Sequence, residues 1–225
     1  MPPTDAELAT QTLADEGRYR FSSFSAADAV TLGLSLRKRF RATQRHIKGK
    51  GLVLSIQTIA GHTLFACTVG DLGDTSGIGD VSLDSWACLE GMIDTVKRTG
   101  HSSFYVEKGM SAMGKTAKQM GLQDDAFRVN GGAFPIWLEN APCCPIAIVA
   151  CYSGASQEDH NLVSITIRDY LVKLRRISQT PAPNMPEQPV PILHHQDSQE
   201  WLPPLPGSSG MEQRPESPFN HNDEH

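Results

Sequence analysis

Apolar side chains recur at helical spacing in several segments, most of them preceded by a residue that suits a helix N-cap. The spacing predicts helices over about 5–15, 26–40, 86–99 and 157–176. Thr4 with Glu7 forms a capping-box pattern ahead of the first helix. Ser25 precedes the second helix, and Ser156 with Asp159 three residues later is expected to cap the last.

Runs rich in β-branched and aromatic residues predict four strands: LVLSIQTIA, HTLFACTV, AFPIWLE and PIAIVACYSG. The first two are joined around Ala60-Gly61, and the other two are separated by NAPCC. Because the strands come as hairpins rather than singly between helices, the sequence predicts an antiparallel sheet. The expected order is α-α-β-β-α-α-β-β-α, an α+β fold in which a two-layer antiparallel sheet has helices packed on it.

Residues 109–116 read GMSAMGKT and satisfy the phosphate-loop pattern G-x-x-x-x-G-K-[ST]. The context differs from that of a phosphate loop, because the preceding HSSFYVEK is no buried strand and no later strand ends in an aspartate for magnesium. Four apolar residues instead share one helical face: Met110, Met113, Ala117 and Met120. We therefore expect one amphipathic helix over 109–120, and nucleotide binding through 109–116 is the disfavoured alternative.

Composition changes sharply near residue 180 of this 225-residue chain. Ten of the fifteen prolines lie between 181 and 218, and 181–225 carries seven acids and one base, a net charge of −6. The remainder has a net charge of +1, since the whole chain is at −5. A Pro-rich acidic segment with few large apolar residues is expected to be disordered. We expect a helical N-terminal extension over 1–19, an α+β domain over 20–178 and a disordered Pro-rich acidic tail over 179–225.

Several classes of protein are disfavoured by the sequence. The first twenty residues are polar and do not resemble a signal peptide, and no run of eighteen apolar residues could span a membrane. The five cysteines contain no C-x-x-C pair, which favours reduced thiols and a cytoplasmic location without membrane insertion. Seven bases lie between 37 and 50, but Phe40 is the sole aromatic among them, so we expect a solvated surface and no nucleic acid.

Polar and glycine residues that could form a ligand site follow or precede the last two predicted strands. The candidate ligand-binding residues are Asn130, Gly131, Gly132, Ser153, Asp159 and His160. The alternative is that Asp159 caps the last helix and His160 is partly exposed. No catalytic residue and no metal ligand can be assigned, because no Ser-His-Asp or Cys-His arrangement is evident, and His62 and His101 are expected on the surface. Whether the chain is an enzyme stays open.

Two stretches carry a family resemblance: NGGAFPI at 130–136 and YSGASQEDHNLV at 152–163. With FSSFSAADAVTLGL, Trp86 and GHSSFYV, they make residues 20–178 similar to the haem-degrading-domain-like proteins, a bacterial and fungal group related to haem-binding sensors and to the C-terminal domain of some corrinoid adenosyltransferases. The resemblance implies a two-layer α+β fold, homo-oligomers and haem as a candidate cofactor. For a fungal member it implies a part in sorting tail-anchored membrane proteins, through a chaperone that recognises acidic C-termini.

The chain departs from the family at two places. Asn130 stands where the family usually has a histidine, and Ala87 to Glu90 stand where an Arg-Lys pair is usual. The leading hypothesis is a non-catalytic, homo-oligomeric, cytosolic binding or adaptor protein, whose acidic tail is a candidate chaperone ligand. The alternative is a haem- or small-molecule-handling enzyme that uses the Asn130–Gly132 turn and His160.

Overall fold

The computed structural model describes residues 2–73, 79–122 and 127–179. Its contacts divide the chain into residues 1–181 and 182–225, and the second unit lies outside the described residues, as does nearly all of the predicted tail. The predicted division at 19 and 178 stays a prediction. Within the described part, no helix is both long and apolar enough to cross a membrane.

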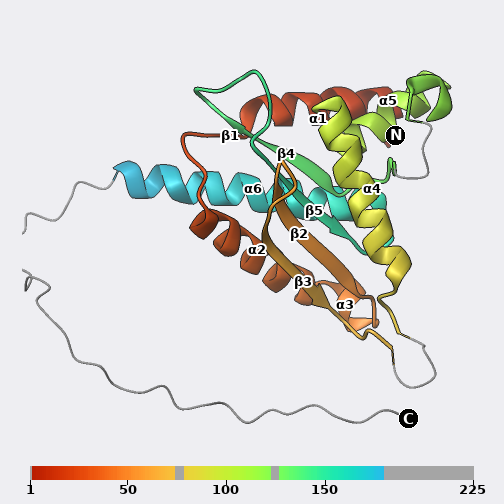
Figure 1. Ribbon diagram of the computed structural model, residues 1–225, viewed down its shortest axis with the longest axis horizontal. Coiled ribbons are helices and arrows are strands. Elements are labelled where there is room, and N and C mark those ends of the chain that lie inside the picture. The colour runs from red at the N-terminus through yellow and green to blue at the C-terminus, as the bar shows by residue number, and fades with distance from the viewer. Residues whose placement is uncertain (1, 74–78, 123–126, 180–225) are drawn as a thin grey trace, which may run out of the picture. The chain divides into compact units, whose positions relative to one another are not determined.

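Five strands form one sheet, shown in Figure 1. Their spatial order is β1 (Arg20–Phe21), β4 (Ala133–Leu138), β5 (Ala147–Tyr152), β2 (Leu52–Thr58) and β3 (Thr63–Val69). The pairs β4–β5, β5–β2 and β2–β3 are antiparallel, as the hairpins predicted, and β1 pairs in parallel with β4. The two residues of β1 are too few to show a period, so the sequence did not predict this strand.

The first, second and last helices begin close to their predicted caps, and a short helix over 44–47 was not predicted. The helices are α1 (Asp5–Arg18), α2 (Ala26–Arg41), α3 (Gln44–Ile47), α4 (Leu83–Thr99), α5 (Ser103–Ala112), the 3-10 helix η1 (Lys118–Met120) and α6 (Ser156–Gln179). Capping boxes form at Thr4 with Glu7 and at Ser25 with Asp28. Ser156, the expected cap of α6, is its first residue instead.

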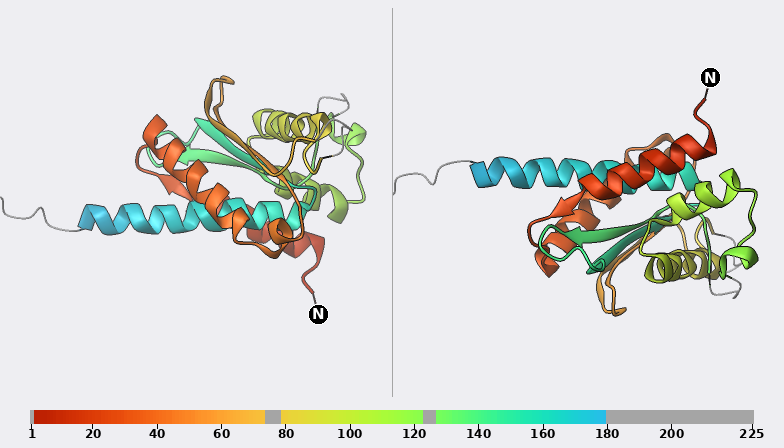
Figure 2. Two further views of the ribbon diagram at one scale, coloured as in Figure 1. Left: turned by 90° about the horizontal axis from the view of Figure 1, so that it is seen from below. Right: turned by 90° about the horizontal axis from the view of Figure 1, so that it is seen from above.

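Helices cover both faces of the sheet (Figure 2). Since successive strand residues point to opposite faces, Leu52, Leu54 and Ile56 of β2 join the core with α2 and α6, while Val53 packs with α4 on the other side. The α+β class and the antiparallel sheet with helices packed on it are confirmed. The structure has a third layer, α4, in addition to the predicted two. The sequence did not predict it, because hairpin periodicity does not tell which strand faces are covered.

The predicted single helix over 109–120 is wrong. α5 begins earlier and ends at Ala112, Gly114 takes a left-handed φ of 61°, and a separate short helix, η1, follows. A right-handed helix cannot continue through that φ. Met113 and Met120 are 53% and 40% exposed, so the expected apolar face is not buried as a unit. Gly109 lies within α5, so the segment also lacks the strand–loop–helix order of a phosphate loop.

Candidate functional site

One end of the sheet gathers most of the predicted site residues. The Gly131-Gly132 turn leads into β4, Ser153 follows β5, and Asp159 and His160 lie in the first turns of α6. Gly132 accepts a hydrogen bond from the Cys151 amide at 3.0 Å. Its φ is +136°, and a Cβ there would lie 2.2 Å from the Cys151 carbonyl oxygen, so only glycine fits. Asn130 is exposed at the rim of this end.

The carboxylate of Asp159 is buried and surrounded by donors. It accepts hydrogen bonds from the Ser153 amide at 2.8 Å, from the Ser153 hydroxyl and from the Ala155 amide at 3.3 Å. Burial raises the pKa of Asp159, and the bonds from Ser153 and Arg45 oppose that rise. Asp159 thus holds the start of α6 against the end of β5, which extends the capping role that the sequence predicted for it.

Arg45 of α3 is the cation beside Asp159. Its Nη1 lies 3.0 Å from Asp159 Oδ1 and its Nη2 donates to the Ser153 carbonyl at 2.8 Å. Its third contact is from Nε to the Glu158 carboxylate at 2.9 Å. The sequence placed Arg45 in a solvated basic run and missed this role. The pairing spans more than a hundred residues, so no local pattern could reveal it.

His160 is buried, with 5% of its surface exposed, so the expectation of a partly exposed side chain is wrong. Its ring stacks on Phe104 of α5, with centroids 4.4 Å apart and an interplanar angle of 16°. Nδ1 has no hydrogen-bond partner among the described residues. Burial lowers the pKa of His160 to about 4, so the imidazole is neutral at pH 7.

The apolar stripe of α6 explains why His160 is buried. His160, Val163 and Ile167 recur at helical spacing and all three are buried against the sheet. Asp159, one position earlier, points to different partners, as the angular offset of adjacent helical residues requires. Extending the predicted stripe by one turn toward the N-terminus would have identified the burial of His160.

Glu107 of α5 ties the glycine turn to two helices. Its Oε2 accepts the Gly131 amide at 3.0 Å and also contacts the Ser156 hydroxyl, which itself accepts the same amide at 2.7 Å. Lys108 beside it pairs with Asp5 of α1 at 3.2 Å. The sequence gave no sign of Glu107, because its partners are distant along the chain.

Two further histidines were expected on the surface. His62 is exposed, whereas His101 is half-buried and its Nδ1 lies 2.9 Å from a carboxylate oxygen of Glu16. Glu16 is buried in α1 and also accepts the Ser102 amide at 2.8 Å. The bond to Glu16 raises the pKa of His101. This pair joins α1 to the start of α5.

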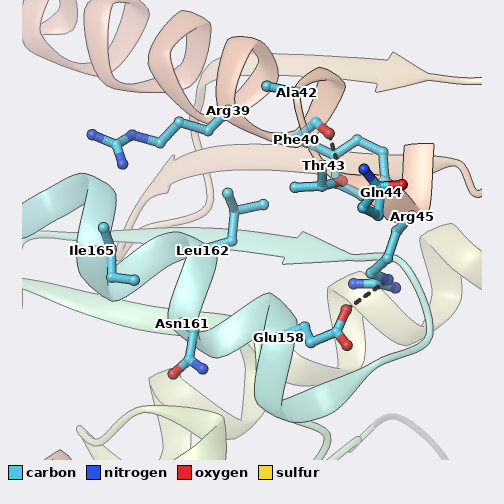
Figure 3. A pocket seen from close by; sticks show the side chains of 10 residues that line it. All are labelled: Arg39, Phe40, Ala42, Thr43, Gln44, Arg45, Glu158, Asn161, Leu162 and Ile165. Carbon is cyan, nitrogen blue, oxygen red and sulfur yellow. Dashed lines mark hydrogen bonds and ion pairs between the residues drawn. The ribbon is translucent and has the colours of Figure 1, made fainter. Parts of the chain in front are cut away.

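A pocket of about 560 Å³ opens beside Arg45, between the end of α2, α3 and α6 (Figure 3). It is lined by Arg39, Phe40, Ala42, Thr43, Gln44, Arg45, Glu158, Asn161, Leu162 and Ile165. Leu162 and Ile165 project from α6 toward α2, and Arg39 and Arg45 lie at opposite ends. The pocket combines an apolar wall with charged ends, which is the usual composition of a small-molecule site.

Two titratable residues at this end of the sheet are held by protein partners. Asp159 is committed to Arg45 and Ser153, and His160 is shielded by Phe104. Among the described residues, no three His, Cys, Asp or Glu side chains gather as a metal site would require. His160 is only 5% exposed and its Nδ1 is buried, so the side chain as placed does not fit the role of a haem-iron ligand.

Comparison with known proteins places this chain in a family. The model of the HbpS-like haem-degrading proteins matches residues 24–168. A UPF0303 protein from Psychromonas ingrahamii is 27% identical over 167 residues, covering 73% of this chain and 93% of that protein. The crystal structure of the Ybr137w protein is similar with a TM-score of 0.60 and 26% identity, covering 74% of this chain and 89% of that one.

Proposed function

The chain belongs to the HbpS-like family of haem-degrading proteins, and from that premise we propose that it is a non-catalytic, homo-oligomeric binding protein. The observation that carries the proposal is the state of His160, the one imidazole at the predicted site. It is buried, stacked on Phe104 and neutral, with a pKa lowered to about 4. A general acid or base must reach its substrate and titrate near the working pH, and His160 does neither.

The same end of the sheet has features that suit binding. Gly131 and Gly132 bring the backbone close to neighbouring elements, and Arg45 holds a fixed guanidinium next to an open pocket. The predicted set of Asn130, Gly131, Gly132, Ser153, Asp159 and His160 becomes, in this proposal, the frame of the site. Within that frame, Ser153 and Asp159 position Arg45.

The exposed edge of the sheet supports self-association. β3 reads TLFACTV, carries no charge or proline, and pairs with β2 alone in the described part of the chain. α2, which packs on β3, exposes Val30 and Leu34 to 42% and 50%. An uncharged edge strand beside exposed apolar side chains is a common site of strand pairing between copies.

Light scattering on the full chain, with and without haemin, tests the proposal. We expect a mass of at least twice 24.5 kDa that does not depend on haemin. A mass of one chain together with turnover of a defined substrate would overturn it.

The role of the acidic segment is a finer part of the proposal. Family resemblance and the net charge of −6 over 181–225 suggest that this segment binds a chaperone used in sorting tail-anchored membrane proteins in the cytoplasm. Capture of such a chaperone by the full chain, lost on removal of 181–225, is the expected result. Equal capture by both forms would contradict it.

The alternative function is haem or small-molecule handling through the Asn130–Gly132 turn and His160. The family's description as haem-degrading favours it. The burial of His160 and the asparagine at position 130 weigh against iron ligation there. In this alternative, His160→Ala would abolish haemin binding and leave the melting temperature unchanged.

A further inference from the structure

We propose that the pocket between α2, α3 and α6 binds a small amphipathic monocarboxylate, with its apolar body against Phe40, Leu162 and Ile165 and its carboxylate on Arg45. The inference rests on the proposed function in that it assigns a ligand class to a binding protein. It names a site that adjoins the predicted residues and is lined by none of them.

The size and walls of the pocket suit such a body. Its volume of about 560 Å³ falls within the range of roughly 300–1,000 Å³ that is typical of small-molecule sites. Ile165 is 39% exposed, and Leu162 beside it is half-buried. An apolar chain placed over these side chains would remove apolar surface from water, at about 25 cal/mol per Å².

The bonds of Arg45 define the polar end. Asp159 and the Ser153 carbonyl hold Nη1 and Nη2 from the protein interior. These two contacts fix the guanidinium plane, since the Asp159 side chain is 1% exposed. Nε directs its N–H to the pocket side, where a carboxylate oxygen can accept it.

Glu158 now occupies that position. Its carboxylate lies 2.9 Å from Arg45 Nε, yet its side chain is 60% exposed. An ion pair with so exposed a partner contributes little to stability, so a ligand carboxylate can replace Glu158 at low cost. Glu158 therefore acts as an internal competitor that shows which chemical group Arg45 accepts.

The charges near Arg45 favour a monoanion over a phosphate ester. Asp159 lies on the other side of the guanidinium, so a dianion would face one fixed negative charge and, nearby, the displaced Glu158. Arg39, at the far end, is paired with Asp169 and is the second cation of the pocket rim. One negative charge on an apolar body matches this arrangement best.

The direction in which one substitution changes ligand affinity distinguishes a carboxylate ligand from an amine ligand. Glu158→Gln removes the competing charge, so octanoate should bind more tightly, by about fivefold for a change of ~1 kcal/mol. An amine would use Glu158 as its partner, and the same substitution would weaken its binding. Calorimetric titration of the full chain with octanoate, octylamine and octanol measures both.

Two exposed positions on α6 provide a matched pair of variants. Ile165→Asp introduces a charge into the apolar wall, and Val172→Asp introduces the same charge seven residues further on, at a side chain of nearly equal exposure (39% and 40%). We expect octanoate binding to be lost in the first variant and retained in the second. Melting curves of both variants confirm that each is folded.

The results that would overturn the proposal are specific. They are no octanoate binding to either wild type or Glu158→Gln, weaker binding after that substitution, or equal effects of the two aspartate variants. The proposed function fails by other readouts, a one-chain mass and substrate turnover. The two proposals can therefore fail independently.

Discussion

The imidazole of His160 lies flat against the ring of Phe104, with the two centroids 4.4 Å apart, and its Nδ1 meets no hydrogen-bond partner among the described residues. The contact joins α6 to α5 behind the glycine turn. A histidine in this setting behaves as an aromatic core residue that can be charged only at a cost. We therefore expect protonation of His160 to lower the stability of the fold.

Acid should destabilise the protein through His160. Its pKa is lowered to about 4 in the folded state against 6.5 when unfolded, so below pH 6.5 the unfolded chain binds the proton first. Stability is full above pH 6.5 and falls by about 3 kcal/mol as the pH approaches 4. Urea unfolding across this pH range measures it. His160→Leu should reduce the slope, and an unchanged slope would refute the assignment.

His101 should act in the opposite sense. The bond to Glu16 raises the pKa of His101, so its stabilising effect is present below pH 6.5 and is lost as the pH rises through the folded pKa. Because His101 is 40% exposed, we expect less than about 1 kcal/mol. Glu16 is the acid that faces it, and Ser102 donates to the other oxygen of that carboxylate. A comparison of His101→Asn with wild type at pH 6 and pH 8.5 should show a smaller difference at the higher pH.

Arg45 should contribute more to stability than any other base of the run at 37–50. Arg45→Met leaves the buried Asp159 without its cation, which costs about 3–5 kcal/mol in comparable cases. Arg41→Met is the control, since Arg41 is exposed and has no ion pair within the described residues, and it should change stability by less than about 0.5 kcal/mol. Equal losses in urea unfolding would show that the Arg45–Asp159 pair is unimportant.

A methyl group at Gly132 should be poorly tolerated. The new Cβ would lie 2.2 Å from the Cys151 carbonyl oxygen at a φ of +136°, so Gly132→Ala should cost about 3 kcal/mol or more. Gly17→Ala is the matched control. Gly17 lies exposed in α1 with nothing within 4 Å of its added Cβ, and alanine there should stabilise by about 0.5–1 kcal/mol. Similar melting temperatures for the two variants would contradict the packing at the turn.

Local patterns predicted much of this fold and several residues at the candidate site, but not the contacts that join them. The capping boxes at Thr4 and Ser25 and the two hairpins follow from residues within a few positions of one another, and the structure has them. The break at Gly114 was missed because helical spacing alone cannot tell a tolerated glycine from one with a left-handed φ. The order of helices and strands along the chain was therefore predicted better than the residue at which each helix ends.

The contacts that organise the site are long-range. Arg45 reaches Asp159 and Glu107 reaches Ser156 across many intervening residues, and neither pairing leaves a periodic trace in the sequence. His160 is different, because its place on the apolar stripe of α6 was visible once the stripe was followed to its start. The residue type of His160 had suggested a ligand-binding role, whereas the helical periodicity indicated a buried packing position.

The melting temperature of His160→Ala at pH 7.5 tests the central claim most directly, with the exposed His62→Ala as the control. Loss of the stacked ring leaves a cavity beside Phe104 and should lower the melting temperature by roughly 5–10 °C, while His62→Ala changes it little. An unchanged melting temperature for His160→Ala, accompanied by loss of ligand binding or turnover, would show that His160 serves function rather than packing and would contradict the account.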